Sequence, residues 1–251
     1  RDVEVFPILR RILRKIRGGN PLYQSPTDMG VNRAGFAITN DELAREAAKQ
    51  EIVRRYFRYR CEYVMGLADK ETLQRVELLM EDLDITPEYR AVIEPAHQAA
   101  IEAQTKNKGN EGIYCGAAIQ LKDGTIVTGS NSSQFHAASS LVLHAIKHLA
   151  EIPEKIELLS DNITASVSGL KTRILNEKTL SLDVVETLIA LSISATTNPA
   201  AQLAMDKLTE LKGCEIHMTH MPTPGDEAGL RRLGVNLTTD PNFASKDLFV
   251  T

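Results

Sequence analysis

The chain has 251 residues, a formal net charge of −4, 43% hydrophobic and 25% charged residues. These values are ordinary for a folded globular protein. No apolar run approaches the roughly 20 residues that span a bilayer, and the first residues lack the apolar core of a signal peptide, so we expect no membrane partner. The chain starts at Arg1 without a Met, which we interpret as the start of a fragment.

The charge distribution and the cysteine content indicate which partners and which cellular compartment to expect. Residues 113–251 hold 11 basic and 15 acidic residues, and the chain has no Trp. An acidic half of this kind argues against a nucleic-acid partner, which favours a basic face. The three cysteines are far apart and odd in number, so we expect reduced, packed thiols and a cytoplasmic protein.

The first part of the chain is predicted to be helical. Residues 8–17 form an amphipathic segment with a basic outer face, open to two interpretations: a solvated or intramolecular surface, or a membrane or nucleic-acid surface. A long loop covers residues 20–38, and further helices are expected at about 39–65, 70–83 and 95–105. The polar segment 106–112 is our predicted domain boundary, giving a helical domain over 1–112 and a second domain over 113–251.

The second domain is predicted to alternate strands with helices. Strands are expected at 113–121, 126–129, 156–159, 214–219 and 235–239, with an Asp-Gly hairpin turn between the first two. Helices are expected at about 134–150, 161–175, 183–195 and 199–211, with another starting after Thr223. This order indicates a three-layer α/β/α sandwich around a mixed sheet.

The segment 196–227 is the centre of the functional prediction. Asn198-Pro199 and Thr223-Pro224 are cap-and-proline pairs, so two helices start on either side of one strand. Helix starts carry unpaired N–H groups and partial positive charge. We therefore expect Thr197 and Asn198 to help bind an anion, although the same residues also suit plain capping.

Other candidates carry the same double interpretation. Ser130, Ser132 and Ser133 precede a helix and are either caps or an anion cradle. Asp226 and Glu227 either complement a helix dipole or meet a ligand, and His220 is expected at the carboxyl end of its strand. His217 and His220 are expected on opposite faces of that strand, so they cannot share one ion. In the long loop, Thr27, Asp28 and Asn32 either bond their own turn or bind a ligand.

Several motifs resemble a bacterial family of unknown function, domain-of-unknown-function family 1846. The matching segments are Ser25–Asn32, Gly35-Phe36, Lys49–Tyr56, Leu191–Ala195, Thr197–Ala201, Gly213–Glu215 and Leu233–Val235. The resemblance implies a protein about twice as long, with a phosphate-loop-like segment in an amino-terminal half that is absent here and would be a partner. The chain is thus interpreted as the carboxy-terminal half. Some family members carry a label of ATP-dependent peptidase, but the chain has neither a His-Glu-x-x-His pair nor a Gly-x-Ser-x-Gly elbow.

The second domain also resembles the deaminase-type fold. Its zinc enzymes need a His or Cys followed by x-Glu on one helix and Pro-Cys-x-x-Cys on another. Here the corresponding positions read His136-Ala137-Ala138 and Pro199-Ala200-Ala201, so we predict no metal site. The sequence names no cofactor and leaves open whether the chain is an enzyme.

Two hypotheses follow from these patterns. The first is a binding protein for an anionic small molecule, a nucleotide or a phosphorylated metabolite, working without zinc and contributing to a larger nucleotide-using enzyme. The second is an oligomerisation module, a homo-oligomer whose deaminase-like domain is inactive.

Overall fold

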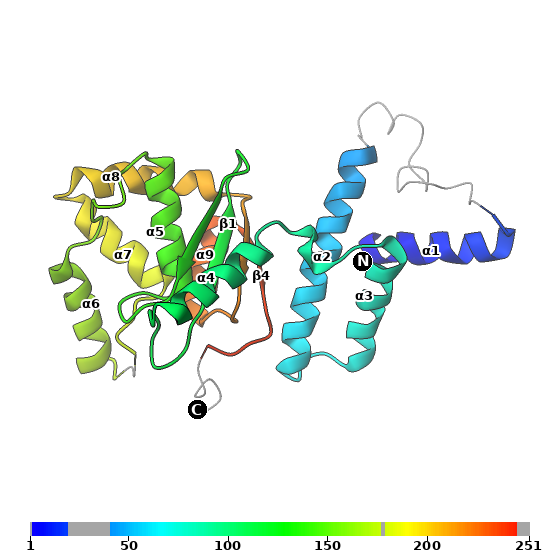
Figure 1. The fold of residues 1–251 in the computed structure, drawn as a ribbon, viewed down its shortest axis with the longest axis horizontal. Coiled ribbons are helices and arrows are strands. Elements are labelled where there is room, and N and C mark those ends of the chain that lie inside the picture. Colours follow the sequence, from blue (N-terminus) through cyan, green and yellow to red (C-terminus); the bar gives the residue numbers. More distant parts are fainter. Residues whose placement is uncertain (1, 20–40, 177–178, 245–251) are drawn as a thin grey trace. The chain divides into compact units, whose positions relative to one another are not determined.

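The structure is a computed structural model that describes residues 2–19, 41–176 and 179–244. The chain divides into two compact units, Arg1–Arg90 and Ala91–Thr251. Figure 1 shows helices alone in the first unit and a sheet with helices in the second. The part of the chain that is described contains no helix long and apolar enough to cross a membrane.

The first unit consists of α1 (Asp2–Arg17), α2 (Asp41–Val64), α3 (Lys70–Leu83) and the 3-10 turn η3 (Pro87–Tyr89). Buried apolar side chains join α2 to α3 because each helix carries them on one face; they are Ile52, Val53, Phe57, Val76, Leu79 and Met80. On the basic face of α1, Arg11 forms a 2.7 Å ion pair with Asp82 of α3. This ion pair supports the interpretation of the basic face as an intramolecular surface.

The second unit is built on a four-stranded sheet. Its strands are β1 (Gly116–Gln120), β2 (Ile126–Ser130), β3 (Glu215–Met218) and β4 (Asn236–Thr239), in the order β2-β1-β3-β4. β1 pairs antiparallel with β2 and β3, while β3 and β4 are parallel. The prediction of a mixed sheet is confirmed, and the carboxyl ends of β2, β3 and β4 lie at the same edge of it.

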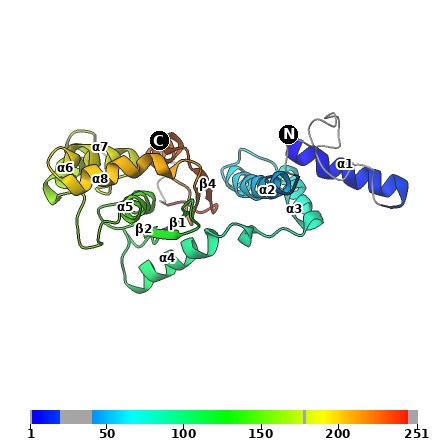
Figure 2. The same cartoon turned by 90° about the horizontal axis from the view of Figure 1, so that it is seen from above.

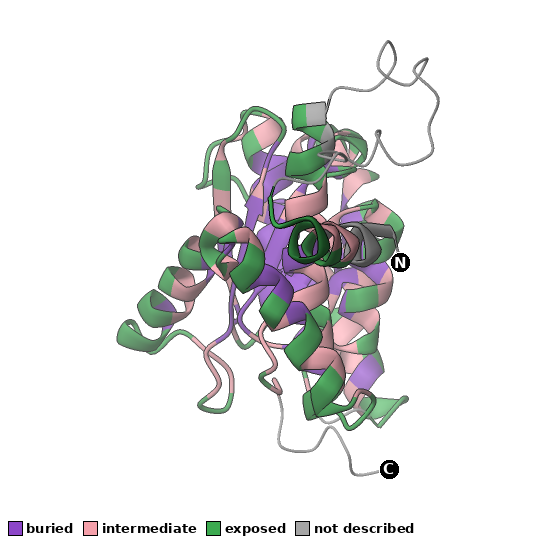
Figure 3. Cartoon of the chain, turned by 90° about the vertical axis from the view of Figure 1, so that its right-hand side faces the viewer, coloured by how far each residue is buried: buried purple, intermediate pink, exposed green. Residues whose placement is uncertain are grey.

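Helices cover both faces of this sheet. α4 (Ile93–Thr105) lies on one face, and α5 (Ala137–Leu149) lies on the other (Figure 2). A side chain on Gly116 would overlap the backbone of α4 at Ala96 and Ala100, so α4 packs directly on β1. The sheet face opposite α4 holds the main core, and the buried residues gather around the strands (Figure 3). Because α4 belongs to this unit, the division of the chain falls between residues 90 and 91, whereas the polar segment 106–112 connects α4 to the sheet.

Between α5 and β3, the described residues form α6 (Asp161–Arg173), α7 (Val184–Ala195), α8 (Pro199–Asp206) and the 3-10 segment η4 (Lys207–Leu211). α9 (Pro224–Leu233) then connects β3 to β4. The predicted strand over 156–159 is wrong, because this segment is irregular. Its Leu158 and Leu159 are buried by helix packing, and the Leu158 carbonyl accepts a 2.5 Å hydrogen bond from Ser194 Oγ instead of pairing in a ladder.

Candidate functional site

Three helices begin at one place beside the carboxyl edge of the sheet. They are α5, α7 and α9, whose N-cap residues are His136, Asp183 and Thr223. The Asp226 carboxylate joins them. It accepts from His136 Nδ1 at 2.8 Å, from the Val184 backbone N–H at 3.0 Å and from Thr223 Oγ1 at 2.8 Å. Segments distant in sequence are therefore fixed together by one side chain.

The surroundings of Asp226 suit a buried negative charge. Its residue is only 2% exposed, and isolated burial of a carboxylate is costly unless hydrogen bonds and opposite charge compensate. The first N–H of α7 and the cap hydroxyl of α9 supply such bonds, and the positive end of each helix adds favourable potential. The predicted dipole role of Asp226 is thus accompanied by a second role, because it also holds His136.

His136 is oriented by both its backbone and its ring. Its backbone N–H donates to Leu182 O at 3.0 Å, and its Nδ1–H donates to Asp226. Burial lowers the pKa of His136, but the hydrogen bond to Asp226 and the charge of that carboxylate outweigh burial and leave the pKa above its usual value. With Nδ1 committed, Nε2 is the ring nitrogen available to a ligand.

A hollow of about 150 Å³ lies beside this pair. His136 and Asp226 line it together with Ser132 and His220. Its remaining walls come from Asn110, Glu111, Ile113, Cys115, Asn131, Phe135, Ala137, Thr179, Ser181, Met218, Met221, Thr223 and Ala244. Burial lowers the pKa of His220, whose Nδ1 lies 2.9 Å from Thr219 Oγ1, so this imidazole favours the neutral form.

Cys115 contributes a thiol to the wall. Burial, and after it the negative charge of Asp226, raises the pKa of this thiol to about 12. A thiol with such a pKa stays protonated near neutrality and is a poor nucleophile. Asn131 fixes the adjacent backbone, since its Oδ1 accepts from Cys115 N at 2.8 Å and its Nδ2 donates to Ile113 O at 2.9 Å. The arrangement suits binding and proton transfer better than attack by sulfur.

The predicted site residues are only partly brought together. Ser132, His220 and Asp226 line the hollow. Ser130 lines a different hollow between α4 and β2, Ser133 is exposed, and the exposed Glu227 pairs with Arg231 at 2.9 Å. The candidates Thr27, Asp28 and Asn32 lie outside the described residues.

Thr197 and Asn198 lie at the far end of α7, and their expected place beside Ser132 is wrong. The 12 residues of α7 separate Asn198 from the Asp226 end by about 18 Å. Asn198 Oδ1 caps α8 through the Ala200 and Ala201 N–H groups, while its Nδ2 donates to Glu157 O. Plain capping, the alternative interpretation, describes these contacts.

The sequence analysis placed His136 at the first position of the deaminase-type motif but did not include it among the site residues, because the Glu expected two positions later is absent. The N-cap position favours Ser, Thr, Asp or Asn, so a His there carries no local explanation. Its partner is 90 residues away in the chain, and no sequence period connects the two. A second group of histidine and aspartate side chains lies on the α4 side of the sheet. It consists of His97, His217 and Asp240 and is the one group in the described ranges arranged as metal ligands.

Comparison with known proteins agrees with the resemblance of the motifs. Residues 88–249 match the family described as "Domain of unknown function DUF1846, C-terminal", and residues 1–84 match "Domain of unknown function DUF1846, N-terminal". The interpretation as a carboxy-terminal half needs correction, because the helical unit matches the N-terminal description. A "UPF0371 protein" of Clostridium botulinum (strain Alaska E43 / Type E3) is 46% identical over 99% of this chain and 49% of its own length. Another, from Clostridium botulinum (strain Kyoto / Type A2), is 45% identical over the same shares.

The chain thus spans about half the length of the curated relatives that it matches. The two matched ranges together run through both units of the structure, and the same relatives align with almost the whole chain. The chain therefore belongs to the DUF1846 family of bacterial proteins of unknown function.

Proposed function

We propose that the chain binds a small anionic metabolite, carrying a phosphate or carboxylate group, in the hollow beside His136 and Asp226. The observation behind this proposal is the 2.8 Å contact between His136 Nδ1 and a carboxylate that is 2% exposed. The contact keeps a proton on Nδ1 and raises the pKa of the ring, so His136 presents a cationic or proton-donating Nε2 at a higher pH than an ordinary histidine.

The buried carboxylate does not prevent anion binding. Asp226 already accepts three hydrogen bonds, and the charge of protonated His136 offsets its own. Ala137, the first residue of α5, lines the hollow, so the positive end of that helix adjoins the bound group. A ligand group at His136 Nε2 would therefore meet an ion pair whose two charges cancel, with the solvent-exposed Glu111 as the other acidic residue on the wall.

The size of the hollow narrows the ligand class. Its volume of about 150 Å³ is below the roughly 300–1,000 Å³ of sites that enclose a whole drug-sized ligand. A phosphate or short carboxylate fits, whereas the base and ribose of a nucleotide would lie outside. A phosphorylated metabolite is thus favoured over a nucleotide held entirely in this hollow.

The same geometry supports acid–base chemistry on the bound molecule. A histidine held in one tautomer by a buried aspartate is a recurring general acid–base arrangement. His136 would exchange a proton with the ligand through Nε2, and Asp226 would position the ring and stabilise its charged form. We further propose that the protein acts in the cytoplasm, where its three buried cysteines would stay reduced.

The deaminase-type interpretation, as a proposal, moves to a different pair of helices. The sequence placed its second motif at Pro199, but the helix that starts opposite α5 is α9, at Thr223–Asp226. His136 and Asp226 would then stand at the two helix starts where that fold gathers its catalytic groups. The sheet order and the two facing helix starts support this correspondence.

Binding is tested by calorimetry with inorganic phosphate and with small sugar phosphates, at pH values from 6 to 8.5. The variant is His136→Gln, and the matched control is His148→Gln, an exposed histidine at the other end of α5. We expect loss of affinity of at least about tenfold in His136→Gln alone, and affinity that weakens as pH rises through the raised pKa of His136. Equal affinities in the two variants would refute the proposal.

Assembly is a second candidate function, supported by an apolar hollow of about 370 Å³ between α7 and α9. Ile189 and Ile193 on α7 are 54% and 48% exposed, and Val185 and Leu188 line the same hollow. We propose a second copy of the chain as its occupant, since exposed apolar patches commonly mark protein contacts. Light scattering should then show a dimer that Ile189→Glu dissociates and that Leu170→Glu, an equally exposed control on α6, leaves intact.

A further inference from the structure

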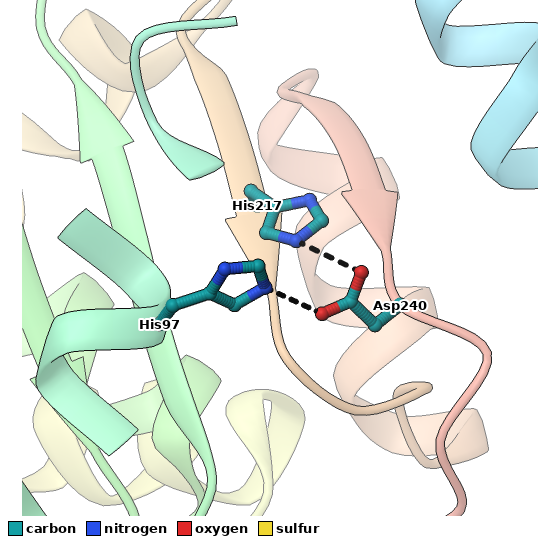
Figure 4. Close-up of side chains that lie close together, drawn as sticks. All are labelled: His97, His217 and Asp240. Carbon is teal, nitrogen blue, oxygen red and sulfur yellow. Dashed lines mark hydrogen bonds and ion pairs between the residues drawn. The ribbon is translucent and has the colours of Figure 1, made fainter. Parts of the chain in front are cut away.

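Three side chains with metal-binding atoms converge on the α4 side of the sheet (Figure 4). His97 comes from α4, His217 from β3, and Asp240 follows directly after β4. Asp240 lies between the two rings, with its Oδ2 2.7 Å from His97 Nε2 and its Oδ1 3.6 Å from His217 Nε2. All the ligand atoms lie within 4.8 Å of one another.

The backbone around these residues is fixed before any ligand arrives. α4 is held against β1 by the close approach at Gly116, and β3 pairs with β4 so that His217 lies beside Thr238. The ladder continues at Asp240, whose N–H donates to Met218 O at 2.9 Å. Ligands supported by regular elements in this way need little reorganisation to receive an ion.

The hydrogen bonds of His217 indicate which of its ring nitrogens carries the proton. The Thr238 hydroxyl donates to Ile216 O at 3.2 Å, so its oxygen accepts from His217 Nδ1–H at 3.0 Å. In the neutral ring this assignment leaves a lone pair on Nε2, which is directed at the Asp240 carboxylate in a position where His217 is 0% exposed. Metal-binding histidines typically donate their other N–H to a fixed acceptor in this manner.

From this arrangement we infer that His97, His217 and Asp240 bind one divalent cation of the first transition-metal row, and that Zn²⁺ suits these ligands best. With the ring proton on Nδ1, a cation could take the lone pair of His217 Nε2 and the Asp240 carboxylate as ligands together. Two imidazoles and one carboxylate suit Zn²⁺ and its neighbours, whereas Mg²⁺ and Ca²⁺ prefer oxygen ligands alone. Ligand atoms around tetrahedral Zn²⁺ lie about 3.3–3.5 Å apart, so side-chain shifts of roughly 1 Å complete the site.

The proposed site is open on one side. The side chain of His97 is 40% exposed, whereas that of Asp240 is 15% exposed and His217 is enclosed. Three protein ligands leave a fourth position of a tetrahedral ion for water or for a ligand group entering from the His97 side. This feature distinguishes the proposed site from a closed structural zinc site with four protein ligands.

The experiment uses the tag-free 251-residue chain dialysed against Zn²⁺. Elemental analysis measures the zinc content, competition with a chromophoric chelator gives the Kd, and Co²⁺ replaces Zn²⁺ for visible spectroscopy. The variant is His97→Ala, because its exposed position makes it compatible with folding, and the matched control is His148→Ala. Circular dichroism verifies that both variants fold.

We expect one zinc ion per chain, a rise of the melting temperature with zinc, and an affinity reduced at least about 100-fold in His97→Ala but unchanged in His148→Ala. Thr238→Val should weaken zinc binding by about 10–100-fold, because it removes the acceptor that orients His217. If the wild-type chain takes up no stoichiometric zinc, or if folded His97→Ala binds it as tightly as the control, the cluster is only a hydrogen-bonded network and the inference is wrong.

Discussion

Replacing Asp226 by asparagine tests the junction of α5, α7 and α9. The substitution preserves the shape of the side chain but removes its charge and turns one acceptor oxygen into an N–H₂ donor. The amide oxygen can still accept a hydrogen bond from Val184 N, which in the native protein donates to Asp226 Oδ1 at 3.0 Å. The new donor group would meet His136 Nδ1–H and the Thr223 hydroxyl, both of which donate in the native protein.

The expected cost follows from these lost contacts. A hydrogen bond to a charged group contributes about 1.5–3 kcal/mol, and removing one partner of a buried pair costs about 3–5 kcal/mol. Because the amide keeps one of the three bonds, we expect Asp226→Asn to lower the free energy of unfolding by about 2–4 kcal/mol. For a domain of this size, that corresponds to a melting temperature lower by roughly 4–16 °C.

Urea unfolding followed by far-UV circular dichroism measures this change, since the chain has no Trp for fluorescence. Hydrogen–deuterium exchange then locates it, and faster exchange should appear at the start of α7, where Val184 loses its charged acceptor. Glu227→Gln is the matched control, because Glu227 is adjacent, exposed and paired only on the surface of α9. If Asp226→Asn and Glu227→Gln both stay within about 0.5 kcal/mol of wild type, Asp226 does not join the helices in the way described.

The remaining predictions concern pH, packing and thiol reactivity. Because folding raises the pKa of His136, the contribution of this residue to stability is complete below its unfolded pKa and disappears as pH rises through its folded pKa. NMR titration should show a lower His136 pKa in Asp226→Asn than in the wild type. An unchanged pKa would contradict this account. Gly116→Ala should cost about 1–3 kcal/mol in chemical unfolding, since its methyl group overlaps the backbone at Ala96, and a wild-type midpoint would show that α4 does not pack on β1. Cys115 should react with a thiol reagent at pH 8 far more slowly in the folded than in the urea-unfolded chain, whereas equal rates would disprove its burial.

Local signals predicted the helix and strand boundaries well. Asn198 and Thr223 cap α8 and α9 as expected, each accepting from backbone N–H groups at the helix start. The Asp-Gly hairpin also forms, with Asp123 Oδ1 accepting from Thr125 N and Gly124 at φ +88°. Such features depend on neighbouring residues alone, so the sequence contains all the necessary information.

The apolar segment 156–159 shows where local patterns fail. A short apolar run suits either a buried strand or a buried loop, and periodicity cannot distinguish them. Here the neighbouring helices supply the partners: Ser194 and Asn198 both donate to the Leu158 carbonyl. The run is therefore buried without pairing in the sheet.

The candidate site depended on information that the sequence does not contain. A helix N-cap lies near each end of α7: Asp183 caps α7 itself, and Asn198, just beyond the other end, caps α8. Which end meets the sheet edge follows from the packing of α6, α7 and α8, so the sequence led to Asn198, while in the structure the other end of α7 meets Asp226 through the Val184 N–H. His97 and Asp240 were missed for a similar reason, since 143 residues separate them.

The bonds made by Asp226 also set an order of events during synthesis. During translation, His136 is added 90 residues before Asp226, and Val184 is added 42 residues before it. At about 5–20 residues per second, a nascent chain spends several seconds with α5 and α7 already made but their shared anchor still missing. Through that interval the Val184 N–H and the His136 ring lack this acceptor, although Asp183 and Glu186 can already form the capping box of α7. A message truncated before α9 would yield a product that can never close this junction.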